Sequence, residues 1–496
     1  MPIRFLPNDP LAQDVLPSRE QPSRLDPPDP RARFSFAGTI PEALYALDTA
    51  EFRFWQCREA ALATLETWGA LAPPAMLWQN GQQLLPLQHD AGSGLGAHYD
   101  RTAVAFLALE SAARKTYPAA STDAVAHEVG HALLDAVRPE LWLSVYPETA
   151  AFHEAFADCM ALLVGFFDPA ARAALLRGGG QLRTPNFLET LAEDVAEGVR
   201  VENGPGDSQS VPRHALNTLQ WDISVNLPPF GPPGTLTAEA HSFSRVFTGC
   251  FYDTICNIFA TRPAGDEQTL LTAAQTAGRL LITAAQAAPE VARFFQAVGR
   301  AMILADETAS GGTNHAAIRD AFGAHGVAIG STAMLAPTAG LAGPAPTVNA
   351  TAGTALLPAA ARRDVLDRIG APSGRLSVTG HAIGGRTVAK AVHRRDIPLG
   401  KLDRRLSGVI VPAVESVLVG ASAARAVLLG HLPDPRTTID EAHHFVETLL
   451  EHDALAFRTA QRGSKRKASG PAGGVLPTHM IHTRGGKKVL TRIRFA

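Results

Sequence analysis

The chain has 496 residues, of which 46% are hydrophobic, and a formal net charge of −2. A chain of this length is expected to form two or three domains with sizeable cores. The nearly balanced charge creates no field that would favour nucleic acid or an anionic membrane, so neither is expected as a partner. Four cysteines with no C-x-x-C pair argue against a disulfide framework and against a thiolate zinc site.

The start of the sequence lacks the basic residues and the continuous apolar stretch of a secretory signal. The sequence also lacks an uninterrupted apolar run of about 18 residues, which a transmembrane helix would need. We therefore expect a protein that is cytoplasmic or exported without a classical signal peptide.

Changes in composition divide the chain into four parts. Residues 1–35 are rich in proline, aspartate and arginine, which predicts an irregular N-terminal lead. Residues 36–330 form the principal domain, in which short apolar runs come first and helical periodicity follows. Residues 331–357 are mostly alanine, threonine, glycine and proline and predict a linker. Residues 358–496 are expected to form a small C-terminal α/β module.

Apolar periodicity and helix-ending residues predict the main elements. Helices are expected over residues 122–137, 148–167, a segment beginning near His241, one long helix or a pair over 267–306, and 314–324. A hairpin is expected over residues 478–495, with its turn at Arg484-Gly485-Gly486.

The helix predicted over residues 122–137 carries an H-E-x-x-H motif. His127 and His131 are four residues apart, so both imidazoles project from one helical face and can hold one metal ion. Glu128 follows the first histidine, where its carboxylate can reach a water molecule bound to that metal. The apolar neighbours Val125 and Val129 favour a buried helix over a charged surface. This pattern predicts a zinc site.

A catalytic zinc site needs a third protein ligand and an open fourth position. The helix predicted over residues 148–167 has Glu154 and Asp158 four residues apart, on a different face from its apolar stripe. Burying a carboxylate without a partner is costly, and zinc gives Glu154 that partner. Asp158 is expected to accept a hydrogen bond from a zinc histidine and so fix its tautomer. His153 is expected to point away from the metal.

With these two motifs, about residues 90–327 resemble the thermolysin family of zinc peptidases. The family pattern is H-E-x-x-H and then a second helix with E-x-x-x-D, present here as His127-Glu128-Val129-Gly130-His131 and Glu154-Ala155-Phe156-Ala157-Asp158. The resemblance implies a gluzincin with His127, His131 and Glu154 as zinc ligands. It implies an α+β, thermolysin-like two-lobed zincin, with a mixed, β-containing N-terminal lobe and a mainly helical C-terminal lobe.

The resemblance assigns roles to four further residues. His241 matches the family histidine that helps to stabilise the transition state, and Tyr146 stands where the family has an oxyanion-binding tyrosine. Ala97 lies in a segment that resembles the strand along which the substrate binds. Arg213 matches an arginine that binds a substrate carbonyl. We therefore expect His241 and Tyr146 among the catalytic residues, and Ala97 and Arg213 in the substrate-binding site.

The sequence also departs from the family. Gly96 replaces the substrate-binding asparagine, and Asp123 alone matches the family's calcium cluster, so calcium is not carried over. The implied function is a zinc-dependent endopeptidase that hydrolyses peptide bonds with a zinc-activated water and Glu128 as general base. Peptides or proteins are the expected substrates, and the C-terminal module is expected to bind a protein partner or to cover the cleft.

Two other functions stay open. One is a zincin-fold binding or effector protein whose proteolytic activity is lost or narrowly restricted, which the departure at Gly96 favours. The other is an aminopeptidase on the same scaffold, although an acidic exopeptidase signature is not evident upstream of the motif. Cleavage of a peptide library, blocked by a chelator, separates the first from an active enzyme, and mapping of the products tests the second.

Overall fold

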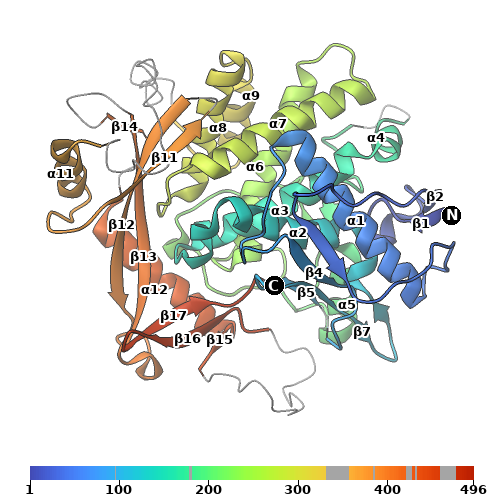
Figure 1. The fold of residues 1–496 in the computed structure, drawn as a ribbon, viewed down its shortest axis with the longest axis horizontal. Helices are drawn as coiled ribbons and strands as arrows, with labels where there is room; N and C mark the ends of the chain where they lie inside the picture. Colours follow the sequence, from blue (N-terminus) through green and yellow to red (C-terminus); the bar gives the residue numbers. More distant parts are fainter. Residues whose placement is uncertain are drawn as a thin grey trace.

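The computed structural model describes residues 1–94, 96–177, 181–330, 357–383, 386–420, 427–429, 433–457 and 476–495. The predicted linker, apart from Leu357, lies outside these residues. The described chain is a mixed α+β protein, as predicted (Figure 1).

Its α-helices are α1 (Ala50–Leu71), α2 (Thr122–Val137), α3 (Pro147–Phe167), α4 (Pro169–Leu176), α5 (Glu193–Asn203), α6 (Ala240–Ala260), α7 (Glu267–Ala287), α8 (Phe294–Ser310), α9 (His315–Ala324), α11 (Ala359–Arg368) and α12 (Pro435–Glu451). Short 3₁₀ turns cover Pro10–Ala12, Pro118–Ala120, Pro139–Leu143, Ser224–Asn226 and Arg404–Leu406.

Its strands are β1 (Ile3–Phe5), β2 (Arg19–Gln21), β3 (Arg33–Phe36), β4 (Leu84–Gln88), β5 (Gly96–Tyr99), β6 (Val104–Leu107), β7 (Leu109–Glu110), β8 (Lys115–Thr116), β9 (Thr190–Leu191), β10 (Arg213–His214), β11 (Ser377–Ile383), β12 (Arg386–Pro398), β13 (Val409–Gly420), β14 (Val427–Leu429), β15 (Leu455–Ala456), β16 (His479–Arg484) and β17 (Lys487–Arg492).

A four-stranded sheet in the order β3-β4-β6-β5 forms the β part of the N-terminal region. β3, β4 and β6 run parallel, and β5 lies antiparallel to β6 at the edge. The long helix α1 packs against β1, α2 and α3 and was not predicted. Its polar residues Gln56 and Glu59 are buried among apolar ones, so the sequence shows no apolar stripe there.

Residues 1–35, expected to form an irregular lead, lie mostly outside regular elements but are tied to the core by short strands. β1 and β2 pair antiparallel, and Ile3 and Phe5 are buried in the main core. The guanidinium group of Arg24 lies over the Phe5 ring, 5.0 Å from its centre. The segment has few large apolar residues, but these are placed in the core, which average composition does not reveal.

The helices predicted for the principal domain are confirmed. α2 and α3 cover the two predicted motif helices, and the region predicted as one helix or a pair is the pair α7 and α8. α3 lies at the centre and packs against α2, α6, α7 and α8. It is long and apolar enough to cross a membrane, but 94% of its most apolar window is buried inside the protein, as in a core helix.

The C-terminal module combines the helices α11 and α12 with a mixed sheet. Its strand order is β11-β12-β13-β17-β16-β15, with β14 also paired to β13. The pairs β13–β17 and β15–β16 are parallel, and the others are antiparallel. The predicted terminal hairpin is confirmed as β16 and β17.

The module packs on the helical region through α12 and the sheet. Val145 and Ala150 share an apolar cluster with Phe445 and Val446 of α12. Lys390 Nζ lies 2.6 Å from Glu140 Oε1 across the same boundary. After β17 the chain crosses back to β5 (Figure 1). The module therefore touches the principal domain at sites far apart in the sequence.

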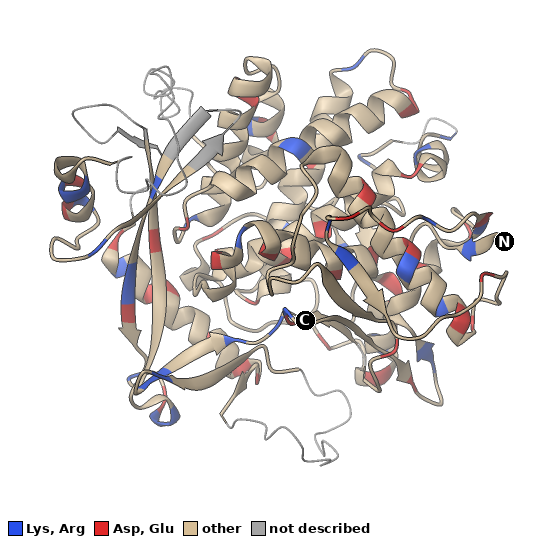
Figure 2. Ribbon diagram, in the orientation of Figure 1, with Lys and Arg blue, Asp and Glu red and all other residues tan. Residues whose placement is uncertain are grey.

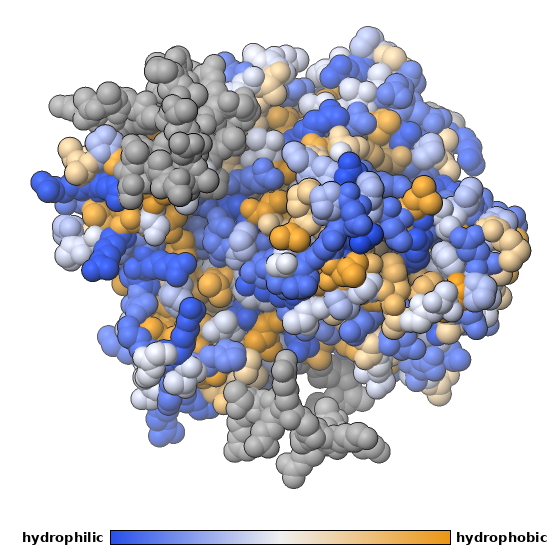
Figure 3. Space-filling view, in the orientation of Figure 1, coloured by the Kyte–Doolittle hydropathy of each residue, from blue (hydrophilic) through white to orange (hydrophobic). Residues whose placement is uncertain are grey.

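Charged residues of both signs are spread over the described elements (Figure 2). On the face shown in Figure 3, hydrophilic residues surround several separate apolar patches. Among the residues that are coloured, this face therefore has no continuous apolar surface.

Candidate metal centre

The motif helix α2 and its neighbour α3 approach each other closely beside the histidines. Ser121 caps α2, and its hydroxyl accepts a hydrogen bond from Ala124 N at 3.3 Å. Gly130 faces α3, where an added Cβ atom would lie only 2.9 Å from Ala157 Cα. The missing side chain at Gly130 therefore lets α3 come near enough for Glu154 to meet the two imidazoles.

His127, His131 and Glu154 form a buried cluster of three potential metal ligands. Glu154 Oε2 lies 3.3 Å from both His127 Nε2 and His131 Nε2, and the two nitrogens are 3.1 Å apart. Tetrahedral zinc with bonds of about 2.0–2.1 Å places neighbouring ligand atoms roughly 3.3–3.4 Å apart. Among the residues that the structure describes, Glu154 Oε2 has no hydrogen-bond partner. The three atoms therefore fit a tetrahedral zinc ion, and Glu154 Oε2 is free to bind it.

The second nitrogen of each imidazole is also engaged. His127 Nδ1 lies 2.8 Å from Asp158 Oδ1, and His131 Nδ1 lies 2.8 Å from His153 Nδ1. With a metal on Nε2, each Nδ1–H donates to its partner, which fixes the tautomer. Burial and the neighbouring His131 hold the pKa of His153 well below its usual value, so His153 is a neutral acceptor.

His153 is not one of the potential metal ligands, as expected, but it contacts the ligand His131 at the nitrogen that faces away from the cluster. It is one residue before Glu154, and the position of α3 across α2 turns its Nδ1 toward His131. The only local sign of this contact is that His153 lies next to the third ligand within an apolar helix.

Glu128 lies next to the cluster with its carboxyl group buried. Its Oε2 atom has no hydrogen-bond partner among the described residues. Burial raises the pKa of Glu128 to about 7, against the lowering effect of the His127 charge. A carboxyl group with a pKa near neutrality is suited to take up and release a proton.

His241, at the start of α6, reaches the same carboxylate as the two motif histidines. Its Nε2 lies 3.3 Å from Glu154 Oε2, and its Nδ1 lies 2.8 Å from Glu239 Oε1. Burial acts to lower the pKa of His241, but Glu154 and Glu239 outweigh it and raise the pKa to about 9. His241 is therefore a cationic donor beside the cluster.

Arg213 is brought to the site through Asp158. Its Nη2 lies 2.7 Å from Asp158 Oδ1, and its Nε lies 3.1 Å from Asp158 Oδ2. Burial would raise the pKa of Asp158, but Arg213 and His127 lower it to about 2, so this carboxyl stays ionised. The Arg213 side chain is 23% exposed and can still face a ligand.

The expected role of Tyr146 is wrong. Tyr146 immediately precedes α3, and eight residues of helix separate it from Glu154 by about 12 Å. Its side chain is fully buried, and its hydroxyl lies 3.3 Å from Thr438 Oγ1 of the C-terminal module. Tyr146 therefore belongs to the contact between domain and module.

Comparison with known proteins adds no relative. The chain matches no protein-family model and no curated protein. The function is therefore argued from the geometry of the site.

Ala97 lies in β5, at the edge of the sheet that runs beside α2. The neighbouring Tyr99 donates its hydroxyl to Asp135 Oδ2 of α2 at 2.9 Å. The backbone N–H and C=O of Tyr99 pair with Phe495, at 3.1 and 3.0 Å. The Phe495 ring stacks on His153 with the ring centres 3.7 Å apart. No sequence pattern indicated this contact.

A second group of potential ligands lies at the start of α2. Oxygen atoms of Asp9, Asp123 and Glu193 lie within 4.8 Å of one another. Asp9 Oδ2 and Glu193 Oε2 have no hydrogen-bond partner in the described part of the chain. The sequence pointed to Asp123 alone, because the three residues come together only in the folded chain.

Proposed function

We propose that the protein is a zinc-dependent endopeptidase of thermolysin-like, two-lobed fold. The observation that carries the proposal is the triangle of His127 Nε2, His131 Nε2 and Glu154 Oε2, with edges of 3.1–3.3 Å. Two imidazoles and one carboxylate form a ligand set used by catalytic zinc sites of hydrolases. A bound zinc ion would supply a Lewis acid that lowers the pKa of a water molecule to about 7.

The remaining residues then have distinct tasks. Glu128, with a pKa of about 7, takes a proton from the attacking water and passes it to the leaving amine. The cationic His241 donates to the oxygen that becomes negative when the peptide carbonyl is attacked. Asp158 orients His127 and holds Arg213 beside the site.

Arg213 and Ala97 are proposed to bind the substrate. The guanidinium group of Arg213 is held in place by Asp158 and still partly exposed, so it can donate to a peptide carbonyl. Ala97 lies in the edge strand β5, whose backbone can pair with an extended peptide. A peptide substrate fits both features.

A second candidate is a binding or effector protein that keeps the zinc site but has lost or restricted proteolysis. The burial of the ligands favours it, because His131 is completely buried and Glu154 is 2% exposed. The position of Tyr146 also favours it, because its hydroxyl is directed to Thr438. Both candidates predict zinc binding, so zinc binding alone does not separate them.

The test is a peptide-library cleavage assay on the zinc-loaded chain, with and without a chelator, beside the Glu128→Gln variant. We expect cleavage inside the peptides that the chelator abolishes and zinc restores. Glu128→Gln should keep its zinc and lose activity by a factor of at least about 100. Release of single N-terminal residues would instead indicate an aminopeptidase. A zinc-loaded chain that cleaves nothing would favour the binding protein.

A further inference from the structure

β5 is an open edge beside the candidate centre. It is the last strand in the order β3-β4-β6-β5, so one row of its backbone groups faces away from the sheet. The hydroxyl of Tyr99 binds Asp135, on the same helix as the metal ligands His127 and His131. An edge strand with free backbone groups is a place where an extended peptide can be added. Such a peptide would lie along α2 and pass the centre.

Part of this edge is occupied by the chain itself. Phe495 pairs antiparallel with Tyr99, and each residue donates its N–H to the C=O of the other. Just before this bridge, the carbonyl of Arg492 accepts a hydrogen bond from Trp142 Nε1 at 3.1 Å. Residues 492–495, which we name the strap, thus make the contact that a bound peptide would make at Tyr99.

The Phe495 ring holds the strap against the histidines. It is 1% exposed and lies nearly parallel to His153 and to His131, with ring centres 3.7 and 4.9 Å away. The guanidinium group of Arg492 covers the ring at 4.1 Å. One aromatic side chain of the strap therefore contacts both a metal ligand and the residue that orients it.

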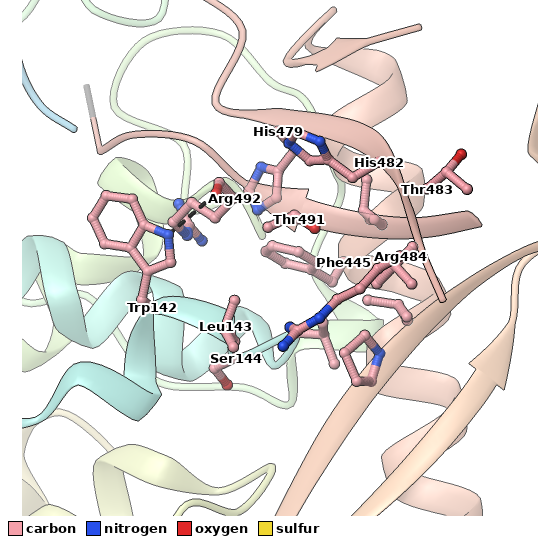
Figure 4. Close-up of a pocket in the computed structure, with 15 residues that line it drawn as sticks. Trp142, Leu143, Ser144, Phe445, His479, His482, Thr483, Arg484, Thr491 and Arg492 are labelled. Atoms are coloured by element: carbon pink, nitrogen blue, oxygen red, sulfur yellow. Dashed lines mark hydrogen bonds between the residues drawn. The ribbon is translucent and has the colours of Figure 1, made fainter. Parts of the chain in front are cut away.

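The attachment behind the strap is incompletely packed. A cavity of about 320 Å³ separates the hairpin β16–β17 from residues 142–145 (Figure 4). Trp142 and Arg492 line one end of it, where Trp142 Nε1 holds the Arg492 carbonyl. Arg492 is only 7% exposed, and its Nε has no hydrogen-bond partner within the described ranges of the chain. At Arg492, the start of the strap therefore borders a cavity and is not closely packed on that side.

We propose that the strap is an internal competitor for the peptide-binding edge of β5, and that an extended peptide must displace it to reach the metal centre. This inference rests on the proposed peptidase function. It deepens that function by naming the element that restrains the pairing of a peptide with β5.

The test compares the unchanged chain with Phe495→Ala and Phe495→Leu. Phe457→Ala is the matched control, because Phe457 lies in the same module and contacts Arg405 instead of β5. A labelled synthetic peptide with the sequence of residues 489–495 is the probe. Its affinity is measured by fluorescence anisotropy on zinc-loaded proteins that also carry Glu128→Gln, so that cleavage does not consume it. Turnover of a library-derived peptide is measured without that substitution.

We expect the probe to bind Phe495→Ala at least tenfold more tightly than the unchanged chain or the control, and turnover to rise severalfold. Amide hydrogen exchange over residues 97–99 should also speed up. Phe495→Leu keeps an apolar side chain but loses the ring stacking. It replaces the alanine variant in the test if Phe495→Ala unfolds at a much lower temperature than the unchanged chain. If all folded variants bind the probe equally and exchange their amides at equal rates, the strap does not compete for β5. This conclusion does not depend on the peptide turnover. If the Phe495 variants bind the probe more tightly but no protein turns over the peptide, competition by the strap is supported and the proposed peptidase function is refuted.

Discussion

Two clusters of potential ligands lie along one helix and differ in almost every chemical respect. Asp123, in the first turn of α2, belongs to an all-carboxylate group with Asp9 and Glu193. His127 and His131 begin only four residues later, about 6 Å along the helix. The same scaffold thus offers oxygen ligands at one end and mostly nitrogen ligands beyond it.

The surroundings set opposite charge states for the carboxyl groups. Burial would raise the pKa of Glu154, but the histidines His241 and His131 keep it well below its usual value. In the other cluster, burial and the charge of Asp123 raise the pKa of Glu193 to about 10. Burial and Asp123 also raise the pKa of Asp9 well above its ordinary value. The carboxyl group of the histidine cluster is therefore ionised and able to bind a metal ion, whereas Glu193 and Asp9 of the acidic cluster favour the protonated form.

The largest expected effect is the loss of zinc when a ligand of the histidine cluster is removed. Removal of a ligand of the acidic cluster is the comparison. His131→Ala should reduce the zinc content of the purified protein to near zero, because two ligands hold zinc poorly. Asp123→Asn, on the same helix, should keep its zinc. Metal analysis after dialysis measures both, and thermal unfolding checks that both are folded. Zinc retained by His131→Ala would remove the histidine cluster as the binding site.

A smaller effect is expected from the partner of His127. Asp158→Asn removes the charge that orients the imidazole and holds Arg213, while the shape of the side chain stays nearly the same. Loss of such a partner typically weakens metal binding by about 10–100-fold. Competition with a chromogenic chelator measures the affinity. The matched control is Asp253→Asn on α6, and an unchanged zinc affinity in Asp158→Asn would show that His127 needs no carboxylate partner.

The close approach of α2 and α3 gives a third prediction. In Gly130→Ala the new Cβ atom would meet Ala157 Cα at 2.9 Å, so the helices must separate. Overpacking of this kind costs about 1–3 kcal/mol, and it should also move Glu154 away from the histidines. Denaturant unfolding and zinc competition measure the two effects. Gly323→Ala, where a Cβ atom meets nothing within 4 Å, is the control. An equal zinc affinity in both variants would show that the helix spacing does not position Glu154.

The parts of the site that lie on regular helices were predictable. The four-residue spacing in α2 and α3 places His127 with His131, and Glu154 with Asp158, on common faces. Helix boundaries came from caps such as Ser121 and from glycine and proline near the ends. The terminal hairpin was predictable because its turn residues are local to it.

The parts that depend on contacts between distant segments were not predictable. Phe495 reaches Tyr99 only after the whole C-terminal module has folded onto the principal domain. Tyr146 looked suitable in the sequence, but its hydroxyl faces Thr438 of α12. Similarly, Asp123 is joined by residues from the N-terminal turn and from α5. Local spacing says which residues share a face, but it does not say what packs against that face.

The last prediction, a change in the pH dependence of stability, tests the acidic cluster. Because the pKa of Glu193 is raised to about 10, this carboxyl group is protonated in the folded protein and ionised in the unfolded chain between about pH 4.5 and pH 10. Stability should therefore fall as pH rises, by up to about 1.4 kcal/mol per pH unit for each extra proton. Glu193→Gln should make this fall shallower in urea unfolding between pH 5 and 9. The control is Glu197→Gln on the same helix, because the pKa of Glu197 is lowered rather than raised.

Repeating the titration with calcium sharpens the comparison between the clusters. An all-oxygen group suits a hard cation, which would replace the protons and flatten the pH dependence of the unchanged chain. Calcium should then have no such effect on Glu193→Gln and should leave the zinc content of the histidine cluster as it was. Identical pH slopes in the unchanged chain and in Glu193→Gln would mean that the acidic cluster is ionised in the folded protein, and that the contrast between the two ends of α2 does not hold.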